Sequence, residues 1–136
     1  MVCFNLFLKN DLFIMPLLSS SPYTRSLIGP GRNAWVKHNG LVWTVGVPTG
    51  RARNADICTQ TKIALASIDA RLAQAGTDKT KILETTVFLT NMKEFKGFDK
   101  VFSAWLPVGI GASRATVGVA ALANNDKVEI KVTVAA

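Results

Sequence analysis

Arg114 stands in surroundings that are unusual for a cation. Between Lys100 and Asp126 it is the only side chain expected to be charged, and it follows the uncharged, glycine-rich stretch 108–113. A guanidinium in so apolar a setting needs a partner. Its rigid fork matches a carboxylate in two parallel hydrogen bonds, and glycines let backbone N–H groups approach a ligand. The sequence leaves two alternatives, a clamp for a small carboxylate substrate or an ion pair with Asp126 or Glu129 within one chain or between subunits.

Glu129 is the second candidate for chemistry. It lies in a segment of alternating apolar and polar residues, where Lys127 and Lys131 share its side of a predicted strand. Cationic neighbours favour the ionised carboxylate, which could accept a proton or hold a water molecule. The alternative is a solvated cross-strand charge pair, which contributes little to stability.

The other reactive residue types exclude several classes of enzyme. Cys3 and Cys58 lie far apart without a Cys-x-x-Cys motif, and there is one histidine, so neither a metal site nor a disulfide scaffold is expected. That histidine stands in the turn sequence His38-Asn39-Gly40, which disfavours hydrolases that need an imidazole base. We therefore expect chemistry without a metal ion and without a histidine base.

The composition is that of one globular domain. Of 136 residues, 49% are hydrophobic and 18% are charged, with 16 Lys and Arg against 9 Asp and Glu, a net charge of +7. So low a charged fraction excludes a disordered chain. The basic residues are scattered, with no RNA-binding aromatic motif and no basic run, so nucleic acid is not the expected partner.

The N-terminal segment differs from the rest of the chain. Its first 20 residues are mostly apolar, but Lys9, Asn10 and Asp11 interrupt them, so no membrane span is expected. No basic region precedes the apolar stretch, which makes a secretory signal the lesser alternative. We predict an extension over residues 1–26, one domain over 27–136, and a cytoplasmic location.

Hydrophobic periodicity predicts the elements that position Arg114 and Glu129. They are strands at 35–38 and 41–45 around the turn Asn39-Gly40, a helix from Asn54 to Ala75 stopped by Gly76, a strand at 81–90, a helix from about Met92, and strands at 114–122 and 127–135. The order is ββαβαββ. Two helices, each apolar on one side, should cover one face of a mixed sheet, which predicts an α+β fold.

The predicted strand 114–122 is apolar or small on both of its faces. Val117, Val119 and Ala121 lie on one face, and the residues between them are also small or weakly polar. Such a strand is typical of a sheet covered on both sides. Because the helices cover one side only, we expect a second copy of the chain to cover the other.

Together these segments resemble the Rid/YjgF family of reactive-intermediate (enamine/imine) deaminases, over about residues 27–136, and its YoaB-like branch most of all. The similarity rests on Gly46-Val47-Pro48 after the hairpin, the helix 54–75, the strand ending at 87–90, and the segments 113–117 and 127–131. The specific part is an arginine followed fifteen positions later by a glutamate, Arg114 and Glu129, in what is taken as the last hairpin.

The resemblance implies a chorismate-mutase-like fold, assembled as a homotrimer whose sheets form a barrel with three clefts at the subunit boundaries. It implies that Arg114 binds the substrate carboxylate and that Glu129 positions the water that hydrolyses a 2-imino acid to a 2-keto acid and ammonia. No metal or organic cofactor is implied. Backbone groups at Val45 and Gly46, together with Thr116, are expected to line the pocket.

The chain differs from the family pattern at several positions. Gly31-Arg32-Asn33 stands nearest to the position of a Gly-Pro-Tyr motif. Val47 replaces a glutamine, Ser113 replaces a proline, and Thr116 stands where cysteine is frequent. These differences affect the deaminase chemistry more than carboxylate binding. Two other functions stay open: a non-catalytic trimer that binds small carboxylates such as 2-keto acids, and an RNA-binding or RNA-cleaving protein, as ascribed to some relatives.

Overall fold

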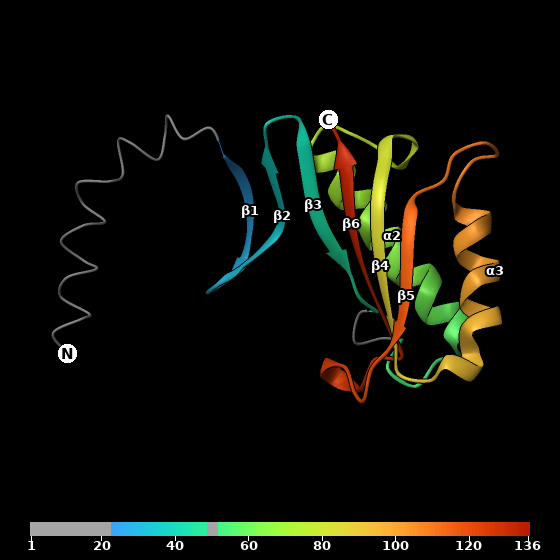
Figure 1. Ribbon diagram of the computed structural model, residues 1–136. Helices are drawn as coiled ribbons and strands as arrows, with labels where there is room; N and C mark the ends of the chain where they lie inside the picture. The colour runs from blue at the N-terminus through green and yellow to red at the C-terminus, as the bar shows by residue number, and fades with distance from the viewer. Residues whose placement is uncertain (1–22, 49–51) are drawn as a thin grey trace, which may run out of the picture.

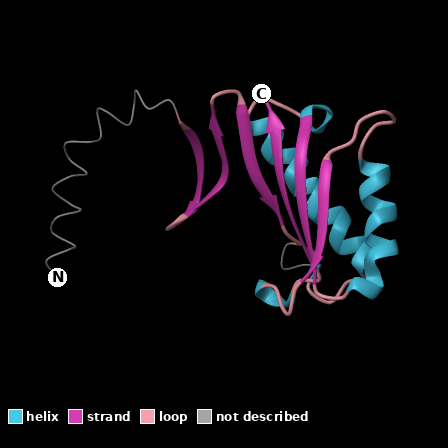
Figure 2. Ribbon diagram, in the orientation of Figure 1, coloured by secondary structure: helices cyan, strands magenta, loops and turns pink. Residues whose placement is uncertain are grey.

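Two helices packed on one face of a mixed six-stranded sheet make up the described part of the chain (Figure 1, Figure 2). The structure, a computed structural model, describes residues 23–48 and 52–136. The strands are β1 (Thr24–Gly29), β2 (Arg32–His38), β3 (Leu41–Gly46), β4 (Ile82–Leu89), β5 (Ser113–Gly118) and β6 (Val128–Ala135), and the helices are α2 (Ile57–Gln74) and α3 (Phe95–Trp105). The predicted α+β class is confirmed.

The strands lie in the order β1-β2-β3-β6-β4-β5. Neighbouring strands run antiparallel, except that β4 and β5 run parallel. Parallel neighbours need a crossover connection, and α3 provides it between β4 and β5. The connections also contain the short 3-10 turns η2 (Lys79–Lys81), η3 (Met92–Glu94) and η4 (Ala123–Asn125).

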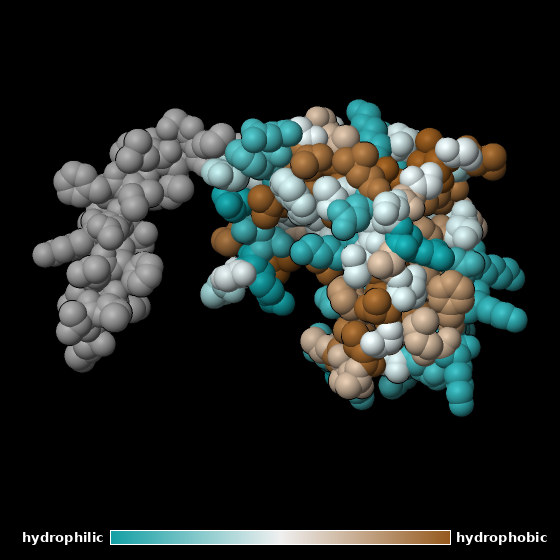
Figure 3. All heavy atoms as spheres, viewed as in Figure 1, coloured by the Kyte–Doolittle hydropathy of each residue, from teal (hydrophilic) through white to brown (hydrophobic). Residues whose placement is uncertain are grey.

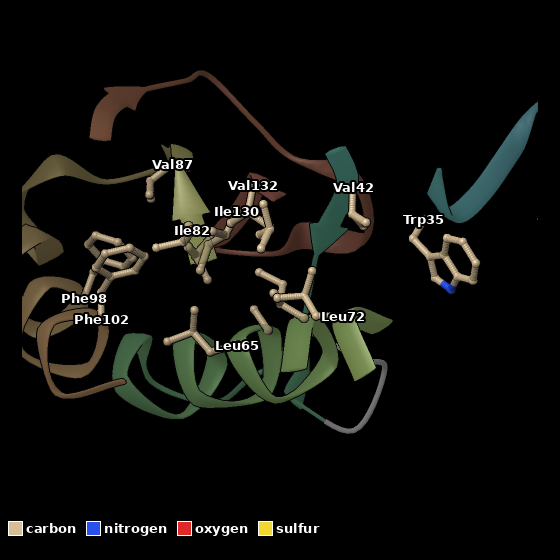
Figure 4. Packing of buried hydrophobic residues seen from close by; sticks show 14 of the residues in the cluster. Trp35, Val42, Leu65, Leu72, Ile82, Val87, Phe98, Phe102, Ile130 and Val132 are labelled. Atoms are coloured by element: carbon tan, nitrogen blue, oxygen red, sulfur yellow. The ribbon is translucent and has the colours of Figure 1, made fainter. Parts of the chain in front are cut away.

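The core lies between the helices and the sheet (Figure 4). Leu65 and Leu72 of α2 point towards Ile130 and Val132 of β6, and each is at most 2% exposed. Phe98 and Phe102 of α3 extend this cluster towards β5, with ring centroids 5.6 Å apart. Each fully buried side chain of this size stabilises the fold by about 1.5–3 kcal/mol relative to exposure.

Both ends of α2 are capped. Asp56 accepts a hydrogen bond from the Thr59 backbone N–H at 2.8 Å, and this bond lowers the pKa of the Asp56 carboxyl. The helix therefore begins after Asp56, slightly later than the predicted start at Asn54. At the other end Gly76 has φ +82°, and the Thr77 N–H donates to the carbonyl of Leu72 at 2.9 Å, so the glycine stop is confirmed.

The turn Asn39-Gly40 joins β2 to β3 as predicted. Asn39 has φ 49° and Gly40 has φ 75°, the left-handed pair that a two-residue hairpin turn requires. The register pairs His38 with Leu41 and Trp35 with Thr44. This hairpin places Trp35 at one end of the core (Figure 4), where its Nε1 donates a hydrogen bond to Gln74 Oε1 at the end of α2, at 3.3 Å.

Strand β1 is an addition to the predicted order, which becomes βββαβαββ. It pairs antiparallel with β2, with register shifts on either side of Leu27. Leu27 is 80% exposed and Ile28 is 48% exposed, so β1 has no buried face and no apolar alternation that the sequence could reveal. The strand starts at Thr24 and crosses the domain boundary expected at Leu27.

A bulge near the start of β4 interrupts the alternation of its buried and exposed residues. A register shift between Ile82 and Glu84 lets Ile82 and Thr85 both face the core, so Leu83 is 49% exposed. Such a bulge reverses the side of every residue before it.

The predicted strand 114–122 is also too long, because β5 ends at Gly118. Val119 and Ala121 lie beyond the strand, although the Val119 N–H still donates to the Leu89 carbonyl at 2.9 Å. Strands β5 and β6 do not form a hairpin, since β4 lies between them. An apolar run alone does not show where a strand stops pairing.

The face of the sheet opposite the helices is bare in the single chain, and apolar and polar residues are mixed over it (Figure 3). Val117 on this face is 41% exposed. In the described part of the chain, no helix is long and apolar enough to span a membrane.

Gly46 is the point where α2 approaches the sheet most tightly. A Cβ at this position would lie 2.7 Å from Ile68 Cγ1 and closer still to the Ala64 carbonyl oxygen. Ala64 and Ile68 are fully buried, so α2 cannot shift to accommodate a Cβ without disturbing the packing around them. Glycine at the end of β3 therefore has a packing role.

We expect Gly46→Ala to lower the free energy of unfolding by about 1–3 kcal/mol, the usual cost of overpacking. The matched control is Gly111→Ala, because a Cβ at Gly111 meets nothing within 4 Å. Urea denaturation of both variants measures the difference. Equal stabilities would mean that α2 moves away from β3 without cost.

A chain starting at Leu27 loses the pairs of Thr24, Arg25 and Ser26 with β2. We expect it to be less stable than a chain starting at Tyr23 by about 1–2 kcal/mol, the sum over three cross-strand pairs. Thermal and urea unfolding compare the two chains. Equal stability would support the boundary at Leu27.

Candidate functional site

Arg114 lies on the edge strand β5 with its side chain on the helix face. It pairs with Thr85, which is buried on that face. Its Nη2 lies 2.8 Å from Asp99 Oδ1 of α3, and its side chain is 24% exposed. The guanidinium carbon lies 5.0 Å from the ring centroid of Phe102 and 5.5 Å from that of Phe98. The aromatic rings and Asp99 hold the guanidinium in one place.

A cavity of about 480 Å³ opens beside this guanidinium. Its lining comes from α3, from β5 and from the loop between them, and includes Asp99, Phe102, Ser103, Leu106, Ile110 and Ala112. Gly109 in this loop has φ +84°, a conformation that favours glycine. The cavity thus combines a cation with an apolar wall, as small-molecule sites do.

The backbone of β5 adds donors next to Arg114. Because the Val119 N–H points to β4, the alternation of a strand turns the N–H groups of Arg114 and Thr116 to the other edge. No described strand pairs with that edge. Thr116 Oγ1 is buried and has no hydrogen-bond partner among the described residues. A small anion at this edge would meet a guanidinium and unpaired N–H groups.

Glu129 occupies a different cavity on the bare face of the sheet. Its neighbours Val128 and Ile130 are buried against the helices, so its own side chain points the other way. It lines a cavity of about 110 Å³ together with Arg32, Val47, Asn124 and Asp126, among others. Burial raises the pKa of the Asp126 carboxyl, and the charge of Arg53 opposes that shift.

The two predicted catalytic residues therefore leave the sheet on opposite faces. Arg114 shares the helix face with Thr85, whereas Glu129 pairs with Phe88 on the bare face. Within the described chain Arg114 forms its ion pair with Asp99 and not with Asp126 or Glu129, while an ion pair between subunits stays a prediction. The physical reason is the strand order, because β4 separates β5 from β6. A single chain does not bring Arg114 and Glu129 together.

Val45 and Gly46 lie closer to Glu129 than to Arg114 in the sheet. Gly46 pairs with Ile130, the neighbour of Glu129, and Val45 pairs with Lys131. The Val45 carbonyl accepts a hydrogen bond from Arg71 Nη1 of α2, and burial lowers the pKa of that guanidinium. The carbonyl of Val45 is thus already engaged.

Sequence reasoning missed Asp99 and Arg71, and it named Arg32 only as a difference from the family pattern. Asp99 follows Phe98 and stands one helical turn after Phe95, at the border of the aromatic face of α3. A charge at such a border is a signal that could have been used. Arg71 and Arg32 carry no such signal, since their positions depend on the packing of α2 and on β1. In residues 23–48 and 52–136 no group of three or more His, Cys, Asp or Glu could hold a metal ion.

Comparison with known proteins identifies the family. A family model described as Endoribonuclease L-PSP matches residues 27–136. The RutC family protein YoaB of Escherichia coli K12 is 37% identical over 100 residues, which cover 74% of this chain and 86% of YoaB. A solved member of the YjgF protein family from Neisseria meningitidis has a TM-score of 0.76 at 29% identity and covers 83% of this chain and 93% of its own. The chain belongs to the YjgF/Rid family.

Other YjgF/Rid proteins agree with this assignment. A Rid family structure from Yersinia pestis has a TM-score of 0.75 at 34% identity, covering 83% of this chain and 93% of its own. The chloroplastic Reactive Intermediate Deaminase A of Arabidopsis thaliana is 31% identical over 109 residues, which cover 76% of this chain and 57% of that protein. The resemblance seen in the sequence, including the YoaB-like branch, is confirmed.

The contact between Arg114 and Asp99 should be measurable in a double-mutant cycle. Both side chains are partly exposed, 24% and 39%, so we expect a coupling of about 0.5–1 kcal/mol between Arg114→Gln and Asp99→Asn in urea denaturation. The control cycle uses Lys127 and Glu94, which lie 3.8 Å apart and should couple less. Zero coupling between Arg114 and Asp99 would mean that the pair does not persist in solution.

Proposed function

We propose that this YjgF/Rid protein hydrolyses small 2-imino acids, or their enamine tautomers, to 2-keto acids and ammonia. The observation that carries the proposal is the position of the Arg114 guanidinium between Asp99 and the cavity beside β5. Asp99 engages Nη2, which leaves other N–H donors of the fork free to face the cavity of about 480 Å³. A cation fixed on one side and open on the other suits the carboxylate of a small acid.

The reaction needs a positioned water and a group that moves protons. Water adds to the carbon of the C=N bond, its proton passes to Glu129, and the nitrogen is protonated in turn. The hydroxyl proton of the resulting carbinolamine then passes to the nitrogen as the C–N bond breaks, which releases ammonia and leaves the keto oxygen. Arg114 holds the carboxylate, while the Thr116 N–H at the free edge of β5 and backbone groups near Gly46 complete the pocket. No metal ion and no organic cofactor take part.

A shared site requires more than one chain. Arg114 and Glu129 leave opposite faces of the sheet, so a substrate that meets both would lie at the free edge of β5, in a cleft that a neighbouring copy closes. The bare sheet face, where Val117 is 41% exposed, supports such an assembly. We propose a cytoplasmic homotrimer with one cleft at each subunit boundary.

The placement of Arg114 and Glu129 on opposite faces of the sheet favours a second candidate function. If assembly does not bring Glu129 to the ligand held by Arg114, the protein binds small carboxylates such as 2-keto acids without turning over their imines. Binding then rests on Arg114 and the edge of β5 alone. Binding of 2-keto acids does not distinguish the two functions, because both candidates bind them. Turnover of 2-aminoacrylate, generated in the assay, does distinguish them, because only the deaminase hydrolyses it.

We expect Arg114→Lys to weaken the binding of pyruvate and 2-oxobutyrate by about 1.5–3 kcal/mol, because lysine keeps the charge but loses the paired hydrogen bonds. Calorimetric titration measures the affinity, and light scattering with thermal melts follows assembly and folding. An unchanged affinity in a destabilised protein would assign Arg114 a structural role and contradict both candidates.

We expect Glu129→Gln to abolish release of ammonia from 2-aminoacrylate while 2-keto acid affinity stays within about twofold, since the glutamine cannot accept the proton. The matched control is Glu84→Gln, an exposed carboxylate on the same sheet face, which should keep full activity. If the wild-type protein binds 2-keto acids but does not turn over 2-aminoacrylate, the deaminase is contradicted and the non-catalytic binding function is retained.

A further inference from the structure

A third cavity lies between the two helices, and none of its lining residues belongs to β5. Helices α2 and α3 lie side by side on the same sheet face (Figure 1). Between them is a cavity of about 510 Å³, within the range of small-molecule sites. Ala66 and Ala104 in its lining are exposed to solvent, so the cavity is an open groove on the outer side of the helix layer. Nothing in the proposed deaminase uses it.

Each end of this groove is closed by a contact between neighbouring elements. At one end Cys58 Sγ donates to the Gly97 carbonyl at 3.6 Å, and a Cβ at Gly97 would lie 2.8 Å from Ile57 Cγ2. At the other end the Trp105 Nε1 donates to Asp69 Oδ2 at 3.0 Å. From residue 58 to residue 69 along α2 the groove is about 16 Å long, at 1.5 Å per residue. The small side chains between these ends leave the space open.

The two ends of the groove carry opposite charges. Lys62 follows Cys58 by one helical turn and Lys100 follows Gly97 by three residues, so both cations flank the same end. Within the described ranges neither lysine has an ion-pair partner within 4 Å. Asp69 marks the other end, where it already accepts from Trp105 and lies 3.7 Å from Lys79 Nζ. The groove thus has one cationic end and an apolar path towards an acid.

We propose that this groove binds an amphipathic monoanion, namely a medium-chain aliphatic carboxylate. The carboxylate lies between Lys62 and Lys100, and the chain runs over Leu65, Val101 and Ala104 to Trp105. Charge complementarity selects an anionic head, and Asp69 repels a second anionic group at the tail. The elongated shape and apolar floor suit a flexible hydrocarbon tail. The proposal stands independently of the deaminase.

Decanoate, below its micellar concentration, is the probe. We expect calorimetric titration to detect one site per chain, and Lys100→Glu to weaken it by about tenfold or more, because a charge-assisted contact becomes a repulsion. The matched control is Lys96→Glu, the same charge change on the same helix outside the groove lining, which should bind as the wild type does. Ala104→Trp should fill the groove and abolish binding.

Two further measurements locate the bound anion. Cys58 at the cationic end should react more slowly with iodoacetamide when decanoate is present, in a Cys3→Ser background that leaves one thiol. Arg114→Lys should leave decanoate affinity unchanged, whereas it weakens pyruvate binding. Loss of decanoate binding in Arg114→Lys, or equal effects of Lys96→Glu and Lys100→Glu, would overturn the groove proposal without touching the deaminase.

Discussion

The pairing of β4 with two strands at once decides where the reactive side chains lie. On one side β6 runs antiparallel to it, and on the other side β5 runs parallel. The register pairs Thr85 with Arg114 and Phe88 with Glu129, and these two residues of β4 point to opposite faces. One strand thus sends the arginine to the helices and the glutamate to the bare face. This double pairing of β4 also leaves β5 at the edge of the sheet, with N–H groups exposed there. It is the reason why any site shared by the arginine and the glutamate needs a second chain.

Local features of the fold could be predicted because each depends on residues close together in the chain. The turn Asn39-Gly40 needs two left-handed residues, and Gly76 ends α2 by its own backbone preference. Strand β1 could not be found, because an exposed strand with Leu27 in water has no periodic apolar face. The placement of β5 beyond β4 depends on a long-range parallel pairing, which two apolar runs close in sequence do not reveal.

In the candidate site, too, the sequence predicted what depends on single residues and did not predict what depends on long-range packing. Arg114 and Glu129 stand out in the sequence by residue type and by the charges near them. What the sequence could not supply is the partner of each. Asp99 meets Arg114 only because α3 crosses back over β5, and Arg32 shares a cavity with Glu129 only because β2 begins near the start of β6. Side chains from separate elements become neighbours through packing alone.

The two edges of the sheet differ in how well they can accept another strand. Strand β1 carries Arg25 and two register shifts around Leu27, features that interrupt an edge and discourage further pairing. Strand β5 pairs with β4 in unbroken register and offers small residues and regular N–H groups at its outer side. Growth of the sheet by strand addition is thus possible at one edge and blocked at the other. Because β1 discourages a further strand, chains cannot join edge after edge into a continuous sheet, which removes one route to a fibre.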